Sequence, residues 1–168
     1  MEFLVPTANS QLDLDGTAFC ASFNLRRTAR AVTRLFDLAF QDSGIRSTQF
    51  TILVGVAKTQ PTSIGALADL LVIDPTTLTR SLRRLEKEGL LTVSERSNMR
   101  QRFVNLTRLG ERTLSRSLPA WRAAQERWIQ AVGPDHWVEL RNELEKLARV
   151  AIDLDDPKKN THVAPVVP

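Results

Sequence analysis

The amino-acid sequence predicts a mainly α-helical protein with a small β-hairpin, arranged as a winged helix-turn-helix lobe plus a helical dimerisation region. Three observations support this fold class. Two short helical segments are separated by a tight turn, two β-prone segments joined by a polar loop follow them, and amphipathic helical patterns occupy both ends of the chain. The 168 residues are enough for one hydrophobic core, and nothing in them indicates a second domain.

Composition and charge are those of an ordinary globular protein, with 42% hydrophobic and 25% charged residues. The net charge of +4 and the pI near 9.8 are weak support for a nucleic-acid partner, because many basic proteins have none. No apolar run approaches the roughly 18 residues of a membrane span, and the N-terminus lacks a basic-then-apolar signal pattern. The single cysteine, Cys20, excludes an intrachain disulfide and a Cys-rich metal site, so we expect a cytoplasmic protein without cofactor or metal.

Two helices are predicted before the helix-turn-helix. The first runs from about Thr17 to Gln41, with an apolar stripe on one side and four arginines at its other positions, and Gly44 ends it. Ser47 is the predicted N-cap of the second helix, which ends before Gln60 and Pro61.

The next two helices have clear ends. Ser63 caps a short helix, and a tight turn of about three residues leads into another, which is helix-turn-helix spacing. Asp74 is a good N-cap for this second helix, and Pro75 suits its first position. Gly89 can take the left-handed conformation that stops it.

This second helix has one apolar and one cationic face. At about 100° per residue, Leu78, Leu82 and Leu85 fall within roughly 60° of each other, and hydroxyl and cationic side chains lie opposite. A solvated surface is the alternative reading, but such faces usually interleave charges of both signs. Cations with threonines near a helix N-terminus suit phosphate oxygens and base edges in a major groove. The candidate DNA-binding residues of the helix are Thr76, Thr77, Thr79, Arg80, Arg83, Arg84 and Lys87.

A hairpin is predicted after this helix. Residues 90–94 and 102–106 are β-prone and flank a polar stretch from Glu95 to Gln101. Three arginines and one glutamate give the hairpin a local balance of +3 − 1 = +2. A basic hairpin directly after a helix-turn-helix indicates a wing, whose candidate DNA-binding residues are Arg96, Asn98, Arg100 and Arg102.

Two long helices are predicted at the C-terminal end. Thr107 caps one that reaches Val132, and Pro119 should bend or split it. Gly133 and Pro134 separate it from a last helix with near-heptad apolar spacing at Trp137, Leu140, Leu144, Leu147 and Val150. Apolar stripes at both chain ends exceed what one small winged helix can cover. We therefore expect pairing with a second copy, with an intramolecular helix pair as the alternative.

A single domain is predicted at residues 17–152, between an N-terminal arm at 1–16 and a flexible tail at 153–168. Within it, residues 61–106 form the winged helix-turn-helix. The flanking segments supply mainly dimerisation and support helices, at 17–60 and 107–152.

Four runs occur in the order and at the spacing of a known family: IGALA at 64–68, TTLTR at 76–80, LEKEGLL at 85–91 and VNLTRLG at 104–110. In these runs the chain resembles the MarR family of dimeric winged-helix transcription regulators, and the resemblance extends roughly from Ala18 to Val150. One departure lies in the wing, where the family usually carries Asp-x-Arg and this chain has Asn98-Met99-Arg100. Asn98 lacks the charge with which the family's aspartate steadies the arginine.

The resemblance implies a homodimer formed by the first and the last two helices. It also implies a pocket for small aromatic or phenolic effectors between the dimer helices and the DNA-binding lobe. The candidate pocket residues combine apolar rings with a few polar groups, and ordinary core is the alternative for each of them: Phe23, Arg27, Phe50, Trp121, Gln125 and Trp128.

Cys20 lies near the start of the first helix, where the organic-hydroperoxide-sensing branch of the family places its reactive cysteine. That branch uses tyrosines to engage the oxidised thiol, and this chain has no tyrosine. A buried or interface cysteine is therefore the alternative to a redox sensor.

No catalytic or metal-binding constellation stands out, and the two histidines, His136 and His162, are far apart in the sequence. We predict a sequence-specific double-stranded DNA-binding transcriptional regulator. It acts as a homodimeric repressor on a palindromic operator and is released by a small-molecule or redox signal. The alternatives are a winged-helix module for protein–protein interaction without specific DNA binding, and an enzyme or small-molecule carrier.

Overall fold

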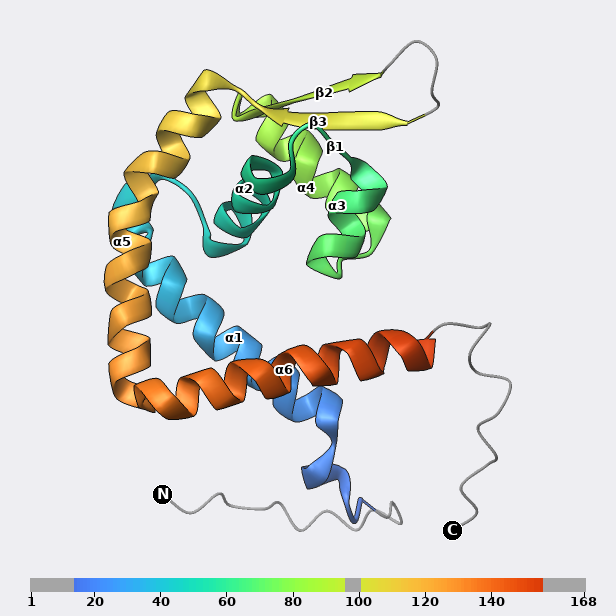
Figure 1. Cartoon of the computed structure of the whole chain (residues 1–168), viewed down its shortest axis with the longest axis vertical. Helices are drawn as coiled ribbons and strands as arrows, with labels where there is room; N and C mark the ends of the chain where they lie inside the picture. Colours follow the sequence, from blue (N-terminus) through green and yellow to red (C-terminus); the bar gives the residue numbers. More distant parts are fainter. Residues whose placement is uncertain (1–13, 96–100, 156–168) are drawn as a thin grey trace, which may run out of the picture. The chain divides into compact units, whose positions relative to one another are not determined.

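The computed structural model describes residues 14–95 and 101–155, and it divides into two compact units, one ending at Ser115 and one beginning at Arg116 (Figure 1). The helices are α1 (Ala21–Ala39), α2 (Ser47–Thr59), α3 (Ile64–Leu71), α4 (Pro75–Lys87), α5 (Arg108–Val132) and α6 (Pro134–Asp155), with short 3₁₀ turns at Thr17–Phe19 and Gln41–Ser43. The strands are β1 (Thr62–Ser63), β2 (Leu91–Glu95) and β3 (Arg102–Leu106). The mainly helical fold class with a small hairpin is confirmed.

The strands form one antiparallel sheet in the order β1-β3-β2. β2 and β3 pair along their full length, with Leu91 opposite Leu106, as the sequence predicts for a wing. β1 pairs with Val104 and Phe103 of β3 and is not predicted, because a strand of two residues has no periodicity to detect.

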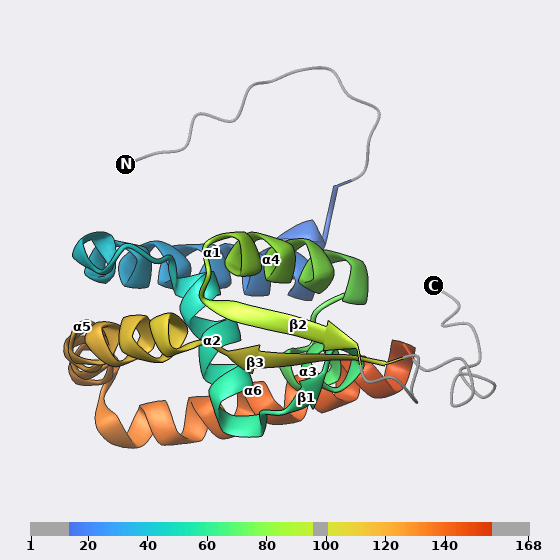
Figure 2. The same ribbon diagram turned by 90° about the horizontal axis from the view of Figure 1, so that it is seen from above.

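Helices α2, α3 and α4 pack with this sheet into one lobe (Figures 1 and 2). Gly55 on α2 allows a close approach, since a Cβ there would lie 3.1 Å from the Leu67 side chain of α3. Burying a leucine or valine contributes about 1.5–3 kcal/mol, so the apolar residues shared by these elements stabilise the lobe. The fully buried ones are Leu53, Val56, Leu67, Leu78, Leu82, Leu85, Leu91 and Val104.

The start of α2 differs from the sequence prediction by one residue. Ser47 is the first residue of the helix, and the N-cap is Arg46, whose backbone N–H donates to Gln49 Oε1 at 2.9 Å. The predicted cap at Ser47 is therefore wrong. The physical reason is that the Asp37 carboxylate of α1 accepts a hydrogen bond at the start of α2, where a capping serine would otherwise act as the acceptor. The Ser47 hydroxyl donates to this carboxylate at 2.8 Å.

The start of α5 is fixed by a threonine and a glycine. Thr107 caps the helix as predicted, because its hydroxyl oxygen accepts the backbone N–H of Gly110 at 3.0 Å. Gly110 is buried, and a Cβ at this position would lie 1.9 Å from the carbonyl oxygen of Leu90. Only glycine permits this approach between α5 and the chain that enters the hairpin.

Helix α5 continues through Pro119 and is not split. Pro119 and Ser115, the residue whose carbonyl loses its helical donor, are both exposed, so water can hydrate the freed group. Helix α6 extends to Asp155, past the predicted domain end at 152, and none of its residues is buried. No helix of the described residues has the length and apolar content needed to cross a membrane. Most of the predicted arm and tail, at 1–13 and 156–168, lies outside the described residues.

Candidate nucleic-acid interface

Helix α4 has the ends that its sequence predicts. The Asp74 carboxylate accepts the backbone N–H of Thr77 at 2.9 Å, and Pro75 occupies the first turn. Glu88 is the C-cap, and Gly89 follows it with φ 72°. The helix that carries most candidate residues is therefore defined by residues within and next to it.

The two faces of α4 are also as predicted. Its leucines face the core, with exposures of at most 1%. Arg80, Arg83 and Lys87 are exposed and form no ion pair within the described residues, so their charges are available to an anionic partner. Thr76, Thr77 and Arg84 are exposed beside them. A shallow, open depression on this face is lined by Pro75, Thr76, Thr79, Arg80 and Arg83.

Thr79 differs from the other candidates. It is half-buried, and its hydroxyl donates to the carbonyl of Pro75, one turn earlier, at 2.7 Å. Because its proton is engaged, Thr79 can offer a ligand only acceptor lone pairs. It is therefore less suited than Thr76 or Thr77 to donate to a phosphate.

The two glutamates of the segment anchor α4 on opposite sides. Glu86 Oε1 accepts the backbone N–H of Val93 in β2 at 3.1 Å, which ties the helix to the hairpin. Glu88 accepts from Arg84 Nε at 2.9 Å and from Gln49 Nε2 of α2 at 2.8 Å. The acidic side chains at this end of α4 thus hold the helix in the lobe and leave the cationic face open.

The described part of the wing contains one candidate residue. Arg102 is half-buried, and its Nε lies 4.0 Å from Glu95 Oε1, where the two strands approach the hairpin loop. Arg96, Asn98 and Arg100 lie outside the described residues. Their predicted role in DNA binding stays a prediction.

The turn between α3 and α4 contains a strained residue. Val72 has φ 51° and ψ 48°, a left-handed conformation that is unusual for a β-branched side chain. The backbone N–H of Val72 and that of Ile73 donate back to α3, at 3.2 Å to Asp69 and 3.0 Å to Ala68. The local strain is therefore offset by hydrogen bonds that fix the direction in which the chain enters α4.

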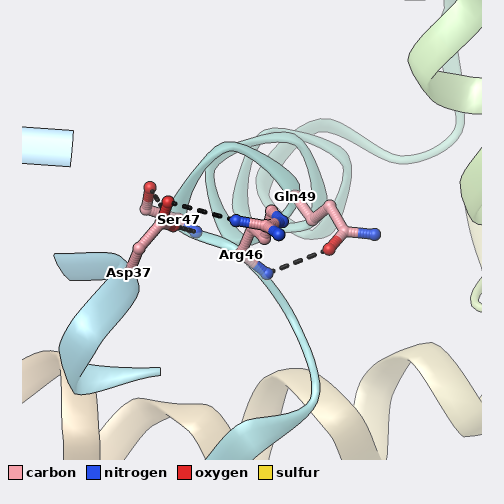
Figure 3. A network of polar contacts seen from close by, with 4 residues as sticks. All are labelled: Asp37, Arg46, Ser47 and Gln49. Carbon is pink, nitrogen blue, oxygen red and sulfur yellow. Dashed lines mark hydrogen bonds and ion pairs between the residues drawn. The ribbon is translucent and has the colours of Figure 1, made fainter. Parts of the chain in front are cut away.

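A polar cluster joins the C-terminal part of α1 to the start of α2 (Figure 3). Asp37 Oδ1 accepts the backbone N–H of Ser47 at 2.7 Å and its hydroxyl at 2.8 Å, and Asp37 Oδ2 lies 3.8 Å from the Arg46 guanidinium. Sequence reasoning missed this contact. The available signal was that Asp37 is the one acidic residue between Thr17 and Gln41.

The predicted ligand-pocket residues are divided between the two compact units. Phe23, Arg27 and Phe50 belong to the first, and the other three, Trp121, Gln125 and Trp128, to the second. Phe50 is buried with its ring centroid 4.8 Å from that of Phe40, which fits ordinary core. Trp128 packs edge-on to Trp137 at 6.0 Å. A common pocket stays a prediction.

Cys20 is exposed and immediately precedes α1. Its backbone carbonyl accepts from the Asn24 side chain at 3.0 Å. Cys20 is thus not buried in the single chain, and both an interface cysteine and a redox sensor stay predictions. His136 is an exposed residue whose Nδ1 lies 4.0 Å from Glu139, and the described residues contain no cluster of side chains that could hold a metal ion.

A capped helix with an open cationic face, preceded by a short helix and a tight turn and followed by a hairpin, defines a winged helix-turn-helix protein. Comparison with known families agrees, since residues 45–101 match the model of the MarR family. Within these residues the chain is therefore similar to the MarR family.

Solved structures of similar proteins cover most of the chain. The transcriptional regulator MosR of Mycobacterium tuberculosis, in complex with DNA, is 29% identical over 81% of this chain and 98% of its own, with a TM-score of 0.75. A mutant MarR of Escherichia coli, complexed with operator DNA, has a TM-score of 0.72 over 81% of this chain and 99% of its own, and at 20% identity it shows the fold alone.

Among curated relatives, an HTH-type transcriptional regulator of Bacillus cereus is 30% identical over 88 residues, which are 52% of this chain and 58% of that protein. The chain thus spans little more than half the length of the curated relatives it matches.

Proposed function

We propose that the chain is a sequence-specific double-stranded DNA-binding transcriptional regulator, a repressor that acts as a homodimer on a palindromic operator. The observation that carries this proposal is the outer face of α4. Arg80, Arg83 and Lys87 project there without ion-pair partners in the described residues, beside the hydroxyls of Thr76 and Thr77. A helix with this face suits a major groove, where arginines bind guanine edges and phosphates.

Each of the side chains on this face has a proposed role. Thr76, Thr77, Arg80 and Arg83 reach base edges and flanking phosphates, while Arg84 and Lys87 contact the sugar–phosphate backbone. The wing arginines Arg96, Arg100 and Arg102 approach the minor groove. The acidic anchors Glu86 and Glu88 support this assignment, since they are engaged within the lobe and do not interrupt the cationic face.

The exposed apolar surface of the end helices supports the homodimer. Neither α1 nor α6 buries a residue in the single chain, and Leu147 and Val150 of α6 expose 51% and 54% of their surfaces. A two-fold dimer presents two reading helices to half-sites about 34–36 Å apart on DNA. In this proposal the regulator acts in the cytoplasm, together with the DNA that it binds.

A small aromatic or phenolic effector, or oxidation of Cys20, releases the operator in this proposal. The exposure of Cys20 supports access by an oxidant. An effector would favour a dimer geometry in which the two reading helices no longer match the half-sites. A thermal-shift screen of phenolic acids tests the first route, and peroxide treatment of the wild type and of Cys20→Ser tests the second.

Selection of duplexes from a random pool, followed by salt-dependent binding of the selected operator, tests the main proposal. We expect a palindromic consensus, dimer stoichiometry and an affinity that falls steeply with salt. Arg83→Ala should weaken binding by about 1–3 kcal/mol and relax the preference at one base pair. Equal affinity for random and selected DNA would favour a winged-helix module for protein contacts instead.

A further inference from the structure

The carboxylate of Glu88 joins α4, the helix proposed to enter the major groove, to α2. Glu88 Oε1 accepts from Arg84 Nε at 2.9 Å, and Glu88 Oε2 accepts from Gln49 Nε2 at 2.8 Å. The first contact spans one helical turn, whereas the second connects residues 39 positions apart in the sequence. The guanidinium of Arg84 is thereby fixed relative to α2 as well as to its own helix.

The oxygen of the Gln49 side-chain amide also takes part in a hydrogen bond. Its Oε1 accepts the backbone N–H of Arg46 at 2.9 Å, which is a capping contact at the start of α2 (Figure 3). A backbone N–H can only donate and a carboxylate can only accept, so these two partners determine which way the Gln49 amide points. The support for Arg84 is therefore a short chain of hydrogen bonds with one consistent orientation.

The position of Arg84 on α4 suits a phosphate contact. At 100° per residue it lies about 40° from Arg80 around the helix, at the edge of the open face on the side of α2. Its side chain is 68% exposed. The bond to Glu88 uses the Nε–H, and the two terminal nitrogens keep four N–H donors, which match the oxygens of a phosphate.

We propose that Glu88 and Gln49 are positioning residues that hold the Arg84 guanidinium ready to bind a backbone phosphate of the operator. This inference rests on the proposed function. A free arginine loses rotamer freedom when it binds, and a side chain already fixed by a carboxylate loses less. Because Glu88 also carries a negative charge that repels phosphate, its removal would mix two effects. Gln49 is neutral and is the better position to change.

A double-mutant cycle tests the proposal, with the selected operator duplex and full-length protein in fluorescence anisotropy titrations at several salt concentrations. Arg84→Ala should weaken binding and reduce the slope of log affinity against log salt by about 0.9, the value for one phosphate contact. Gln49→Ala should weaken binding about threefold to tenfold with an unchanged slope, because it removes no charge.

The matched control is Arg83, a neighbouring arginine of α4 without an ion-pair partner among the described residues. Gln49→Ala should change affinity less than about twofold in an Arg84→Ala background and keep its full effect in an Arg83→Ala background. Thermal unfolding of each variant measures how much the loss of the α2 capping contact destabilises the protein. If Gln49 acted only through the stability of α2, Gln49→Ala would weaken DNA binding equally in both backgrounds.

Three outcomes would overturn the inference. Equal weakening by Gln49→Ala in both backgrounds would mean that it acts through the stability of α2. An unchanged affinity of Gln49→Ala, or an unchanged salt slope of Arg84→Ala while Arg83→Ala weakens binding, would mean that Arg84 is not a positioned phosphate contact. Failure of the wild type to prefer its selected duplex would refute the proposed function itself, and this inference with it.

Discussion

The unit that ends at Ser115 and helix α6 use their apolar residues in opposite ways. In the first unit the leucines of α4 are buried almost completely, and the carboxylates of Glu86 and Glu88 on the same helix accept hydrogen bonds from the Val93 backbone and the Gln49 side chain. Helix α6 has a regular apolar stripe, but Leu144, Leu147 and Val150 expose 39%, 51% and 54%. A helical stripe of this kind is typical of a surface that a partner covers.

The comparison separates two kinds of stability. The first unit contains its own core and needs no second chain to form it. Helix α6 is amphipathic, but none of its residues is fully buried in the single chain, so part of its contribution to stability depends on association and hence on protein concentration.

The largest effect is expected from opening a cavity in the core of the first unit. Leu82→Ala should lower the free energy of unfolding by about 2–5 kcal/mol, because Leu82 is 1% exposed and its neighbours cannot all close the space. Chemical denaturation at several protein concentrations measures it. The loss should be similar at each concentration, whereas the loss for Leu147→Ala should shrink when the protein is dilute enough to be monomeric. If the losses for the two variants depended on protein concentration in the same way, the proposed difference between the core and α6 would be wrong.

Two glycine substitutions should have opposite signs. Gly110→Ala places a Cβ 1.9 Å from the Leu90 carbonyl oxygen, and since the backbone must shift, we expect a loss of about 1–3 kcal/mol. Gly65→Ala on α3 meets nothing within 4 Å and should stabilise by about 0.4–1 kcal/mol through the lower entropy of the unfolded chain. Thermal unfolding of both variants checks this, and a stable Gly110→Ala would show that the approach of α5 to the hairpin is not rigid.

Removing the acceptor at the α1–α2 junction should have an intermediate effect. Asp37→Ala leaves the Ser47 backbone N–H and hydroxyl without their acceptor and should cost about 0.5–2 kcal/mol, as loss of a helix cap does. Asp42→Ala nearby is the control, because Asp42 is exposed. Hydrogen exchange of the α2 amides gives a local readout, and protection unchanged by Asp37→Ala would contradict the assigned role.

The smallest effect is expected from the ion pairs of α6. The Lys146–Glu143 pair, at 2.7 Å, joins side chains that are 70% and 59% exposed. Lys146→Ala should therefore change stability by no more than about 0.5 kcal/mol, and less at high salt. A larger loss of stability would indicate that the polar side of α6 also lies in the interface between two copies.

Local features were predicted well because their causes lie within a few residues. The caps at Ser63, Asp74 and Thr107 depend on side chains next to the backbone groups that they satisfy. The hairpin after Gly89 follows from two β-prone segments on either side of a short polar loop. The exposed cationic face of α4 follows in the same way, from the spacing of its three leucines. The cap assigned to Ser47 failed because its acceptor, Asp37, lies ten residues earlier on another helix.

Helix caps and apolar periodicity act over one or two turns, so residues near α4 in the sequence are enough to predict this helix and its two faces. The partners of the acidic residues depend on the fold: Glu86 binds the hairpin, Glu88 binds α2, and Asp37 binds the start of α2. Charge and composition do not distinguish a solvated carboxylate from one that fixes an arginine. That distinction depends on which distant donor the fold brings within hydrogen-bonding distance.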